Sequence, residues 1–447
     1  MNMKSKFTFI ILLWSSVFCR AQYTWHALPA APISWRFDDF YFLNPQIGWA
    51  INPNYDNIAP NQPGRIFKTT DGGSTWLELV DSSNTFYRSV GFADSLIGWV
   101  GNLADTTYYP SIGGRTTNDT VPLYQTSNGG ITWAPANLPH PHPAGICGIS
   151  VVTDSVVFAY GRWMSPAGYV KTINKGGSWM FTNMDSMAFG LVDGHFFNAD
   201  TGFITGMGTD RKAIILYTVN GGSSWSYVYH STRSDTDRVW KLYFPSRDTG
   251  YASIEAGGTA NPYNTWFLKT TNGGLTWTES PFITSYDEEG IGFINNDVGW
   301  IGGDIAKGTY VTYDGGNTWA VDPAFGMETP PYVYSTGFSI NRFRSFGDTL
   351  MYASGNTIYK LDLANTGINE ILNKNQNISE YPNPATTSLT IASQSPINQV
   401  KIINLLGQTV YSHEFSAATV QVNVSTLPSA LYFVKVNGTV VIKFVKE

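Results

Sequence analysis

Short runs of alternating apolar and polar residues recur along most of the chain, and Gly, Asn, Asp or Ser residues bound each run. Typical examples are RIFKT at 65–69 and WFLKT at 266–270. A period of two with turn residues at both ends predicts strands of antiparallel β-sheet. The pattern therefore predicts an all-β protein.

An eight-residue signature, T-x-[D/N]-x-G-x-[S/T]-W, follows these strands six times. It first starts at Thr69 (TTDGGSTW) and last at Thr312 (TYDGGNTW). A supersecondary unit that repeats at roughly 40–50 residues predicts a propeller or a solenoid. The signature resembles the Asp-box of sialidase-like and sortilin-like β-propellers. Its closing tryptophans, spaced by 42 to 57 residues, are Trp76, Trp133, Trp179, Trp225, Trp277 and Trp319.

A second motif lies upstream of the signature: a strand ending in Phe, an Asn- or Asp-rich turn, and Gly followed by an aromatic residue. Examples are FLNPQIGWA at 42–50 and FADSLIGWV at 92–100. Two weaker versions, at 152–161 and 347–355, complete seven units. Four strands per unit predict a seven-bladed β-propeller over residues 22–364. A solenoid is the alternative, but the terminal capping repeats that it would need are not evident.

The seventh unit has a third strand at 356–363, but no signature follows it. Instead, the N-terminal sequence TWHAL at 24–28 matches the strand TWLEL at 75–79. We therefore expect the N-terminal strand to supply the outer strand of the seventh blade and so to close the ring.

The third position of the signature exchanges freely between Asp and Asn. A short side chain of either type can accept backbone N–H bonds from the turn that follows. A metal ligand or a catalytic acid would not tolerate this exchange, so these residues are predicted to anchor hairpins. They are Asp71, Asn128, Asn174, Asn220, Asn272 and Asp314.

Residues 1–21 are predicted to be a signal peptide. Lys4 and Lys6 precede an apolar stretch of 12 residues at 7–18. This stretch is too short to span a bilayer, which takes about 20 residues. Lipid attachment at Cys19 is the alternative, but it would need a small residue where Phe18 stands. We therefore expect export through Sec and no transmembrane segment.

Composition narrows the partners and the chemistry further. Removing the three basic residues of the leader takes the net charge from −6 to −9, which argues against nucleic acid as a partner. Cys147 is then the only cysteine, and its apolar neighbours predict a buried residue. His140 and His142 have no third metal ligand nearby. We expect no metal and no cofactor.

The composition changes after Leu363. Residues 365–379 are predicted to be a linker, and residues 380–447 a small immunoglobulin-like β-sandwich. The last segment resembles the C-terminal sorting domain of the type IX secretion system of Bacteroidota, through YPNPA at 381–385 and LYFVK at 431–435. The resemblance implies outer-membrane passage, the secretion machinery as a partner, and release or attachment at the cell surface. An ordinary adhesive module is the alternative.

The predicted propeller resembles the photosystem II stability/assembly factor-like group, through its Gly-Trp and K-T-x-[D/N]-G-G-x-T-W motifs. That resemblance implies the fold alone, so function has to be argued from the site. In this connectivity the Asp-box turns lie on one face and the variable loops on the other, where binding usually resides. Aromatic, arginine and carboxylate side chains there suit a glycan or protein ligand. The expected ligand-binding residues are Trp35, Arg36, Tyr87, Arg88, Arg238, Trp240, Glu288 and Glu289.

A secreted glycoside hydrolase acting on polysaccharide or sialoglycan is the alternative function. It would need two carboxylates about 5 to 9 Å apart, for which Asp38 and Glu289 are candidates. A sialidase would also need six blades and an Arg-Ile-Pro motif near its start, and the sequence shows neither. We therefore expect a monomeric recognition protein, secreted or attached to the cell surface, with no catalytic residues.

Overall fold

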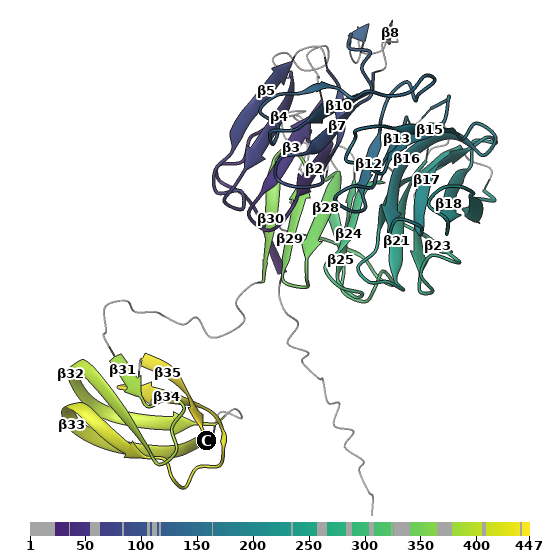
Figure 1. Ribbon diagram of the computed structural model, residues 1–447. Coiled ribbons are helices and arrows are strands. Elements are labelled where there is room, and N and C mark those ends of the chain that lie inside the picture. The colour runs from purple at the N-terminus through teal and green to yellow at the C-terminus, as the bar shows by residue number, and fades with distance from the viewer. Residues whose placement is uncertain are drawn as a thin grey trace, which may run out of the picture. The chain divides into compact units, whose positions relative to one another are not determined.

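The computed structural model describes two compact units, residues Tyr23–Leu363 and the C-terminal residues after 377, each taken here by itself (Figure 1). None of the described residues belongs to a helix that is long and apolar enough to cross a membrane. The predicted signal peptide and most of the predicted linker lie outside the described residues. Those residues are 23–34, 36–53, 63–82, 85–104, 108–109, 114–115, 118–162, 164–233, 236–256, 266–282, 288–303, 308–322, 325, 340–363, 378–404, 408–438 and 440–447.

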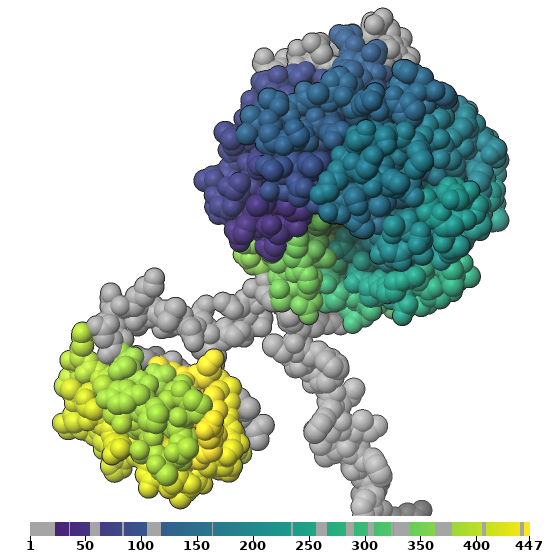
Figure 2. All heavy atoms as spheres, in the orientation of Figure 1, coloured from purple at the N-terminus to yellow at the C-terminus, as the bar shows by residue number. Residues whose placement is uncertain are grey.

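The first unit is an all-β propeller of seven four-stranded antiparallel sheets. The innermost strands of successive sheets contact one another in a closed cycle, from β2 to β6 and onward to β28, which contacts β2 again. The colours of Figures 1 and 2 follow this order, and the green strands β28 to β30 lie beside the purple strands β2 and β3. The predicted all-β propeller is therefore confirmed.

The first three blades place short inner strands around the axis. A hairpin of β8 (Tyr108–Tyr109) and β9 (Gly114–Arg115) lies in the chain between β7 and β10. From the inside outwards, the blades are β2 (Asp39–Phe42), β3 (Gly48–Asn52), β4 (Gly64–Thr69) and β5 (Leu77–Ser82); β6 (Tyr87–Phe92), β7 (Gly98–Asn102), β10 (Leu123–Thr126) and β11 (Ala134–Pro135); and β12 (Gly148–Val151), β13 (Val157–Gly161), β14 (Gly168–Thr172) and β15 (Met180–Asn183).

The fourth and fifth blades have longer inner strands than the first three. The next three blades are β16 (Ala188–Phe196), β17 (Gly202–Gly208), β18 (Ala213–Thr218) and β19 (Ser226–His230); β20 (Asp237–Tyr243), β21 (Gly250–Ala256), β22 (Trp266–Thr270) and β23 (Thr278–Pro281); and β24 (Glu288–Phe293), β25 (Gly299–Gly303), β26 (Thr309–Thr312) and β27 (Ala320–Val321).

The two ends of the propeller sequence meet in the seventh blade. It consists of β28 (Arg342–Phe346), β29 (Leu350–Ser354), β30 (Ile358–Leu363) and, as the outer strand, β1 (Tyr23–Ala27). β1 pairs antiparallel with β30, and Trp25 lies opposite Leu361. The Trp25 side chain is 4% exposed, and its ring centroid lies 5.3 Å from that of Trp300 in the sixth blade. The predicted closure by the N-terminal strand is confirmed.

Stacked aromatic rings fill the interfaces between blades. At five interfaces the aromatic residue after Gly in one blade stacks on the Phe at the end of the inner strand of the next, as Trp49 does on Phe92, with ring centroids 3.5 Å apart. Tyr352 stacks on Phe42 at 4.1 Å and so joins the seventh blade to the first. A Cβ atom at Gly98 would lie 2.3 Å from the Phe92 ring, so this position excludes any side chain. The upstream motif therefore encodes the contact between neighbouring blades.

The Asp-box turns show why Asp and Asn exchange. Asp71 Oδ1 accepts a bond from Thr75 N (2.9 Å), and Oδ2 accepts one from Thr75 Oγ1 (2.6 Å). Asn128 Oδ1 likewise accepts from Thr132 N (3.0 Å), but Asn128 Nδ2 donates to Thr132 Oγ1 (2.8 Å). A hydroxyl can donate or accept, so it satisfies either residue.

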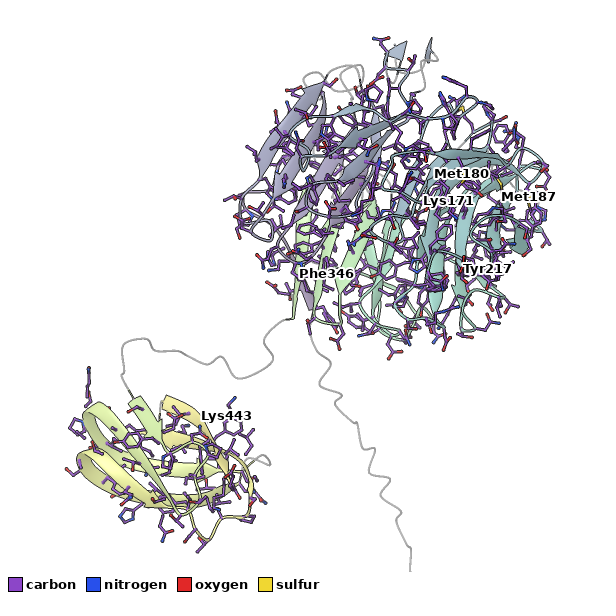
Figure 3. All side chains as sticks on the ribbon, in the orientation of Figure 1. Lys171, Met180, Met187, Tyr217, Phe346 and Lys443 are labelled. Atoms are coloured by element: carbon purple, nitrogen blue, oxygen red, sulfur yellow. The ribbon has the colours of Figure 1, made fainter. Side chains whose placement is uncertain are left out.

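The same turns tie neighbouring blades together. Lys68 Nζ of the first blade donates to Gly129 O in the turn of the second blade (3.2 Å), and Trp49 Nε1 donates to the same oxygen (3.0 Å). Lys171 Nζ, labelled in Figure 3, donates to Gly221 O of the fourth blade (2.8 Å). The lysine that precedes the signature threonine therefore bonds to the neighbouring blade and stabilises the propeller.

The second unit is a five-stranded antiparallel structure around one apolar core. Its central strand β32 pairs with β31, β33 and β34, and β34 pairs with β35. Residues 388–391 and 399–403 lie in this single strand, because the polar residues between them form register shifts against β33 instead of a turn. The strands are β31 (Ile378–Tyr381), β32 (Ser388–Ile403), β33 (Thr409–Asn423), β34 (Ala430–Val436) and β35 (Val440–Lys446).

The YPNPA segment binds the last strand of this unit. Asn383 Oδ1 accepts a bond from Val445 N (2.9 Å), and Asn383 Nδ2 donates to Lys443 O (3.1 Å). Ala385 is fully buried, and its N–H donates to Val445 O (2.8 Å). The opening and closing motifs of the tail are therefore parts of one contact.

Candidate binding site in the central channel

The inner strands bring charged residues to the axis of the propeller. Register shifts occur in β16 between Leu191 and Asp193 and in β20 between Val239 and Lys241. Such bulges re-aim side chains and are common beside functional sites. Asp193 and Lys241 directly follow the two shifts, and both are buried.

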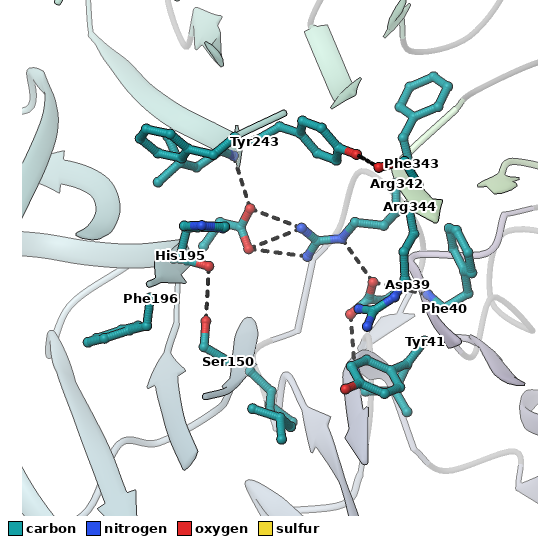
Figure 4. Close-up of a pocket in the computed structure, with 18 residues that line it drawn as sticks. Asp39, Phe40, Tyr41, Ser150, His195, Phe196, Tyr243, Arg342, Phe343 and Arg344 are labelled. Atoms are coloured by element: carbon teal, nitrogen blue, oxygen red, sulfur yellow. Dashed lines mark hydrogen bonds and ion pairs between the residues drawn. The ribbon is translucent and has the colours of Figure 1, made fainter. Parts of the chain in front are cut away.

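An arginine spans the channel between two aspartates. Arg342 of β28 donates from Nε to Asp39 Oδ1 of β2 (2.9 Å) and from Nη1 to Asp193 Oδ2 of β16 (3.0 Å; Figure 4). Asp39 Oδ2 also accepts from Val90 N (3.1 Å), and Asp193 Oδ2 accepts from Leu242 N (3.0 Å). This triad, Asp39–Arg342–Asp193, therefore links the first, fourth and seventh blades.

The triad sets the charge state of its surroundings. Burial raises the pKa of Asp193, but Arg342 and Lys241 outweigh this effect and hold that pKa below its ordinary value. Burial and the repulsion of Arg342 lower the pKa of Lys241 to about 8, although Asp193 partly opposes them. Arg342 and Lys241 thus place two positive charges beside the two carboxyl groups of the triad.

A second ionic cluster lies at the start of the inner strands. Asp38 pairs with Arg36 and with Arg88 Nη1, the latter at 2.6 Å. The Arg88 guanidinium lies 5.0 Å from the ring centroid of Trp240, which comes from the fifth blade. Burial would raise the pKa of Asp38, but the two arginines hold it below its ordinary value.

Four of the predicted ligand-binding residues meet in this second cluster, namely Arg36, Arg88, Arg238 and Trp240. Arg88 and Trp240 are less than 10% exposed, and Arg238 pairs with Glu255 at 3.7 Å. These side chains are therefore engaged mainly with one another.

The other four predicted residues do not join this cluster. Tyr87 is 6% exposed and packs in the core between the first two blades, so the expectation that it faces a ligand needs correction. Burial raises the pKa of its hydroxyl to about 12. Trp35 lies outside the described residues, as do the side chains of Glu288 and Glu289 at the start of β24.

An open cavity of about 370 Å³ lies at the other end of the inner strands, with the triad as its floor (Figure 4). Asp39 and Arg342 begin their strands, but most of the other lining residues come from the second halves of the inner strands, next to the Asn/Asp turns. In six blades this turn bonds to the Asp-box turn, as Gly72 N does to Gln46 O (2.9 Å). The cavity is thus on the Asp-box side, opposite to the face expected from the variable loops. Its polar side chains include Tyr41, His195, Tyr243, Arg344 and Ser345.

None of the five predicted binding residues whose side chains the structure describes lines this cavity. The sequence does indicate some of the residues that line the cavity. Three inner strands carry two polar residues, two positions apart, on a face where apolar residues are expected. These pairs are Asp39 with Tyr41, Asp193 with His195, and Arg342 with Arg344. A period of two places both members of each pair on the same face of a strand.

The channel offers ionised carboxylates but little acid chemistry. Glycoside hydrolysis needs one carboxylic acid with a raised pKa, whereas the pKa of Asp38 and that of Asp193 are both lowered. In the part of the chain that the structure describes, no group of three or more His, Cys, Asp or Glu residues could hold a metal ion. Cys147 is buried beside Phe86 and Leu103.

Comparison with known proteins identifies the C-terminal unit and supports the fold of the first. Residues 379–447 match the family model of the secretion system C-terminal sorting domain. With the motifs described above, this match identifies a type IX sorting domain and supports export to the cell surface or the medium. A comparison with curated protein sequences found no match.

Several solved propellers share the fold. YCF48 from Cyanidioschyzon merolae is 16% identical, with a TM-score of 0.53 over 77% of this chain and 100% of its own. A YCF48 bound to D1 peptide is also 16% identical, with a TM-score of 0.50 over 76% of this chain and 95% of its own. A GH74 xyloglucanase from Xanthomonas campestris is 14% identical, with a TM-score of 0.53 over 84% of this chain and 60% of its own. These likenesses concern the fold alone.

Proposed function

We propose that this protein is an exported recognition propeller that binds a glycan or protein ligand without converting it. The leader at 1–21 directs it through Sec, and the tail engages the type IX secretion machinery. The propeller then acts as a monomer at the cell surface or in the medium. The other predicted ligand-binding residues at the variable-loop face remain part of this proposal beside the channel cavity, namely Trp35, Arg36, Arg88, Arg238, Trp240, Glu288 and Glu289.

The observation that carries the proposal is the charge state of the channel. Arg342 and Lys241 hold the pKa of Asp193 below its ordinary value despite its burial, so this carboxylate has no proton to give. Both aspartates of the triad accept bonds from Arg342 and from backbone N–H groups. The cavity above them combines aromatic walls with a few polar groups, as small-ligand sites commonly do.

The related folds leave both functions open. One such ring, YCF48, is seen with a bound peptide, and another is a xyloglucanase. Because the same fold serves both, the choice between binding and hydrolysis depends on the site.

The proposal is tested with glycan and peptide arrays probed by the purified chain without residues 1–21. We expect saturable binding to a defined set of ligands. Failure to bind any glycan or peptide would contradict the proposal, and so would the release of sugar from a bound glycan.

A further inference from the structure

We propose that the channel cavity binds the terminal residue of an acidic glycan of the uronate class, whose carboxylate pairs with Arg344. This inference rests on the proposed recognition function and names its ligand. Arg344 lies in β28, two residues after the triad arginine, and lines the cavity.

The Arg344 guanidinium is held in place but has donors to spare. It lies 4.1 Å from the ring centroid of Tyr41 and 5.8 Å from that of Phe346. No carboxylate among the described residues pairs with it, although its side chain is half-buried. An arginine in such a position is normally paired, and its planar fork matches a carboxylate. We therefore expect a ligand to supply the carboxylate that pairs with the Arg344 guanidinium.

The floor of the cavity does not oppose an anion. The N–H groups of Arg342 donate to Asp39 and Asp193, and Lys241 supplies a second positive charge beside them. The charges of these four residues cancel. Arg344 therefore leaves one positive charge unbalanced at the cavity, which favours a ligand with one negative charge.

The walls of the cavity favour a sugar as the carrier of that charge. The Tyr41 hydroxyl and the His195 ring make no hydrogen bond to any described residue, so both are available to sugar hydroxyls. Burial lowers the pKa of His195 to about 4, so its neutral ring offers one donor and one acceptor. Figure 4 shows His195 and Arg344 on either side of the Arg342 guanidinium. Phe244, with its ring centroid 4.9 Å from that of His195, adds an aromatic wall.

The shape of the cavity favours the end of a chain over its middle. Arg342 bridges Asp39 and Asp193 across the channel, and all three residues line the cavity, so the triad lies in the path of a ligand that would pass through. A volume of about 370 Å³ lies near the lower end of the range for ligand pockets, about 300 to 1,000 Å³. We therefore expect a terminal residue to enter while the rest of the glycan stays outside.

The test is calorimetric titration of the chain with oligogalacturonide and oligoglucuronide, and with neutral oligosaccharides of equal length. We expect the acidic sugars to bind and Arg344→Gln to weaken them about tenfold or more. Arg247→Gln is the matched control, because Arg247 also stacks on a ring, that of Phe197 at 3.9 Å, but lies outside the cavity lining. Tyr41→Phe gives a second, milder variant that keeps the ring and removes only the hydroxyl.

Each outcome separates this inference from the proposed function. Equal binding of acidic and neutral sugars, or equal affinity of the Arg344→Gln and Arg247→Gln variants, would overturn the uronate site and leave the recognition function standing. Binding of an acidic peptide but of no glycan, lost in Arg344→Gln, would overturn the sugar assignment. An unchanged unfolding temperature of Arg344→Gln shows that a loss of affinity is not a loss of fold.

Discussion

Replacing Trp25 by Ala tests whether the N-terminal strand closes the ring. The Trp25 side chain is 4% exposed, and its ring packs on Trp300, Phe325 and Phe343 with centroid distances of 5.3, 5.3 and 5.8 Å. Truncation of such a side chain costs about 3 to 5 kcal/mol. Unfolding entropy of about 2.1 cal/mol/K per residue gives about 0.7 kcal/mol/K for residues Tyr23–Leu363. A loss of about 4 kcal/mol therefore lowers Tm by about 6 °C.

Tryptophan fluorescence is the assay, because residues after Trp319 include no tryptophan and the signal reports the propeller alone within the full chain. The matched control is Thr24→Ala, an exposed neighbour in the same strand, whose effect should stay within about 0.5 kcal/mol. If Trp25→Ala melts with the control, β1 does not close the ring. Deleting residues 22–30 is the stronger perturbation, because it also exposes the edge of β30 and should abolish cooperative unfolding.

Three further predictions concern the triad and the Asp-box. Arg342→Met should cost about 3 to 5 kcal/mol in denaturant unfolding, because Asp39 and Asp193 stay buried without their partner, and adding Asn at both positions should recover part of the loss. The pKa of Lys241 is about 8 in the folded protein and ordinarily 10.5. Between these pH values the unfolded chain binds more protons than the folded one, so the free energy of unfolding should rise from pH 8 to 10. Unfolding midpoints of Lys241→Met should lack that rise, and a rise that persists would assign it to another group. Asp71→Asn should keep the Tm within about 1 °C, whereas Asp71→Ala loses the three bonds that this side chain accepts from Thr69 and Thr75 and should melt at a lower temperature than Asp71→Asn; equal Tm values would show that the acceptor is dispensable.

Local motifs of this sequence predict the ring because each blade repeats one set of short-range contacts. The F-x5-G-aromatic spacing specifies a steric fit, as between Gly98 and Phe92, and the six Asp-box signatures specify hairpins. The unmatched strand at 24–28 predicts the closure for the same reason: one outer strand was missing from the count.

The channel could not be predicted in the same way, because its residues lie far apart in the chain. Asp39, Asp193 and Arg342 meet only when the ring is closed and its bulges set the height of each side chain. Polar residues at alternate positions of an inner strand indicate the residues that line the cavity. The position of a residue in or next to a variable loop does not by itself indicate that it faces a ligand. Tyr87 shows this, since it stands at a strand start yet packs inward between blades.

The most direct test of the central claim follows the fate of a bound glycan. The full chain is incubated with each array ligand at saturating concentration, and the ligand is analysed by mass spectrometry over a day. Binding without turnover predicts an unchanged ligand mass and a stable bound fraction. New reducing ends that disappear in Asp193→Asn or Asp38→Asn would contradict the account and establish a hydrolase.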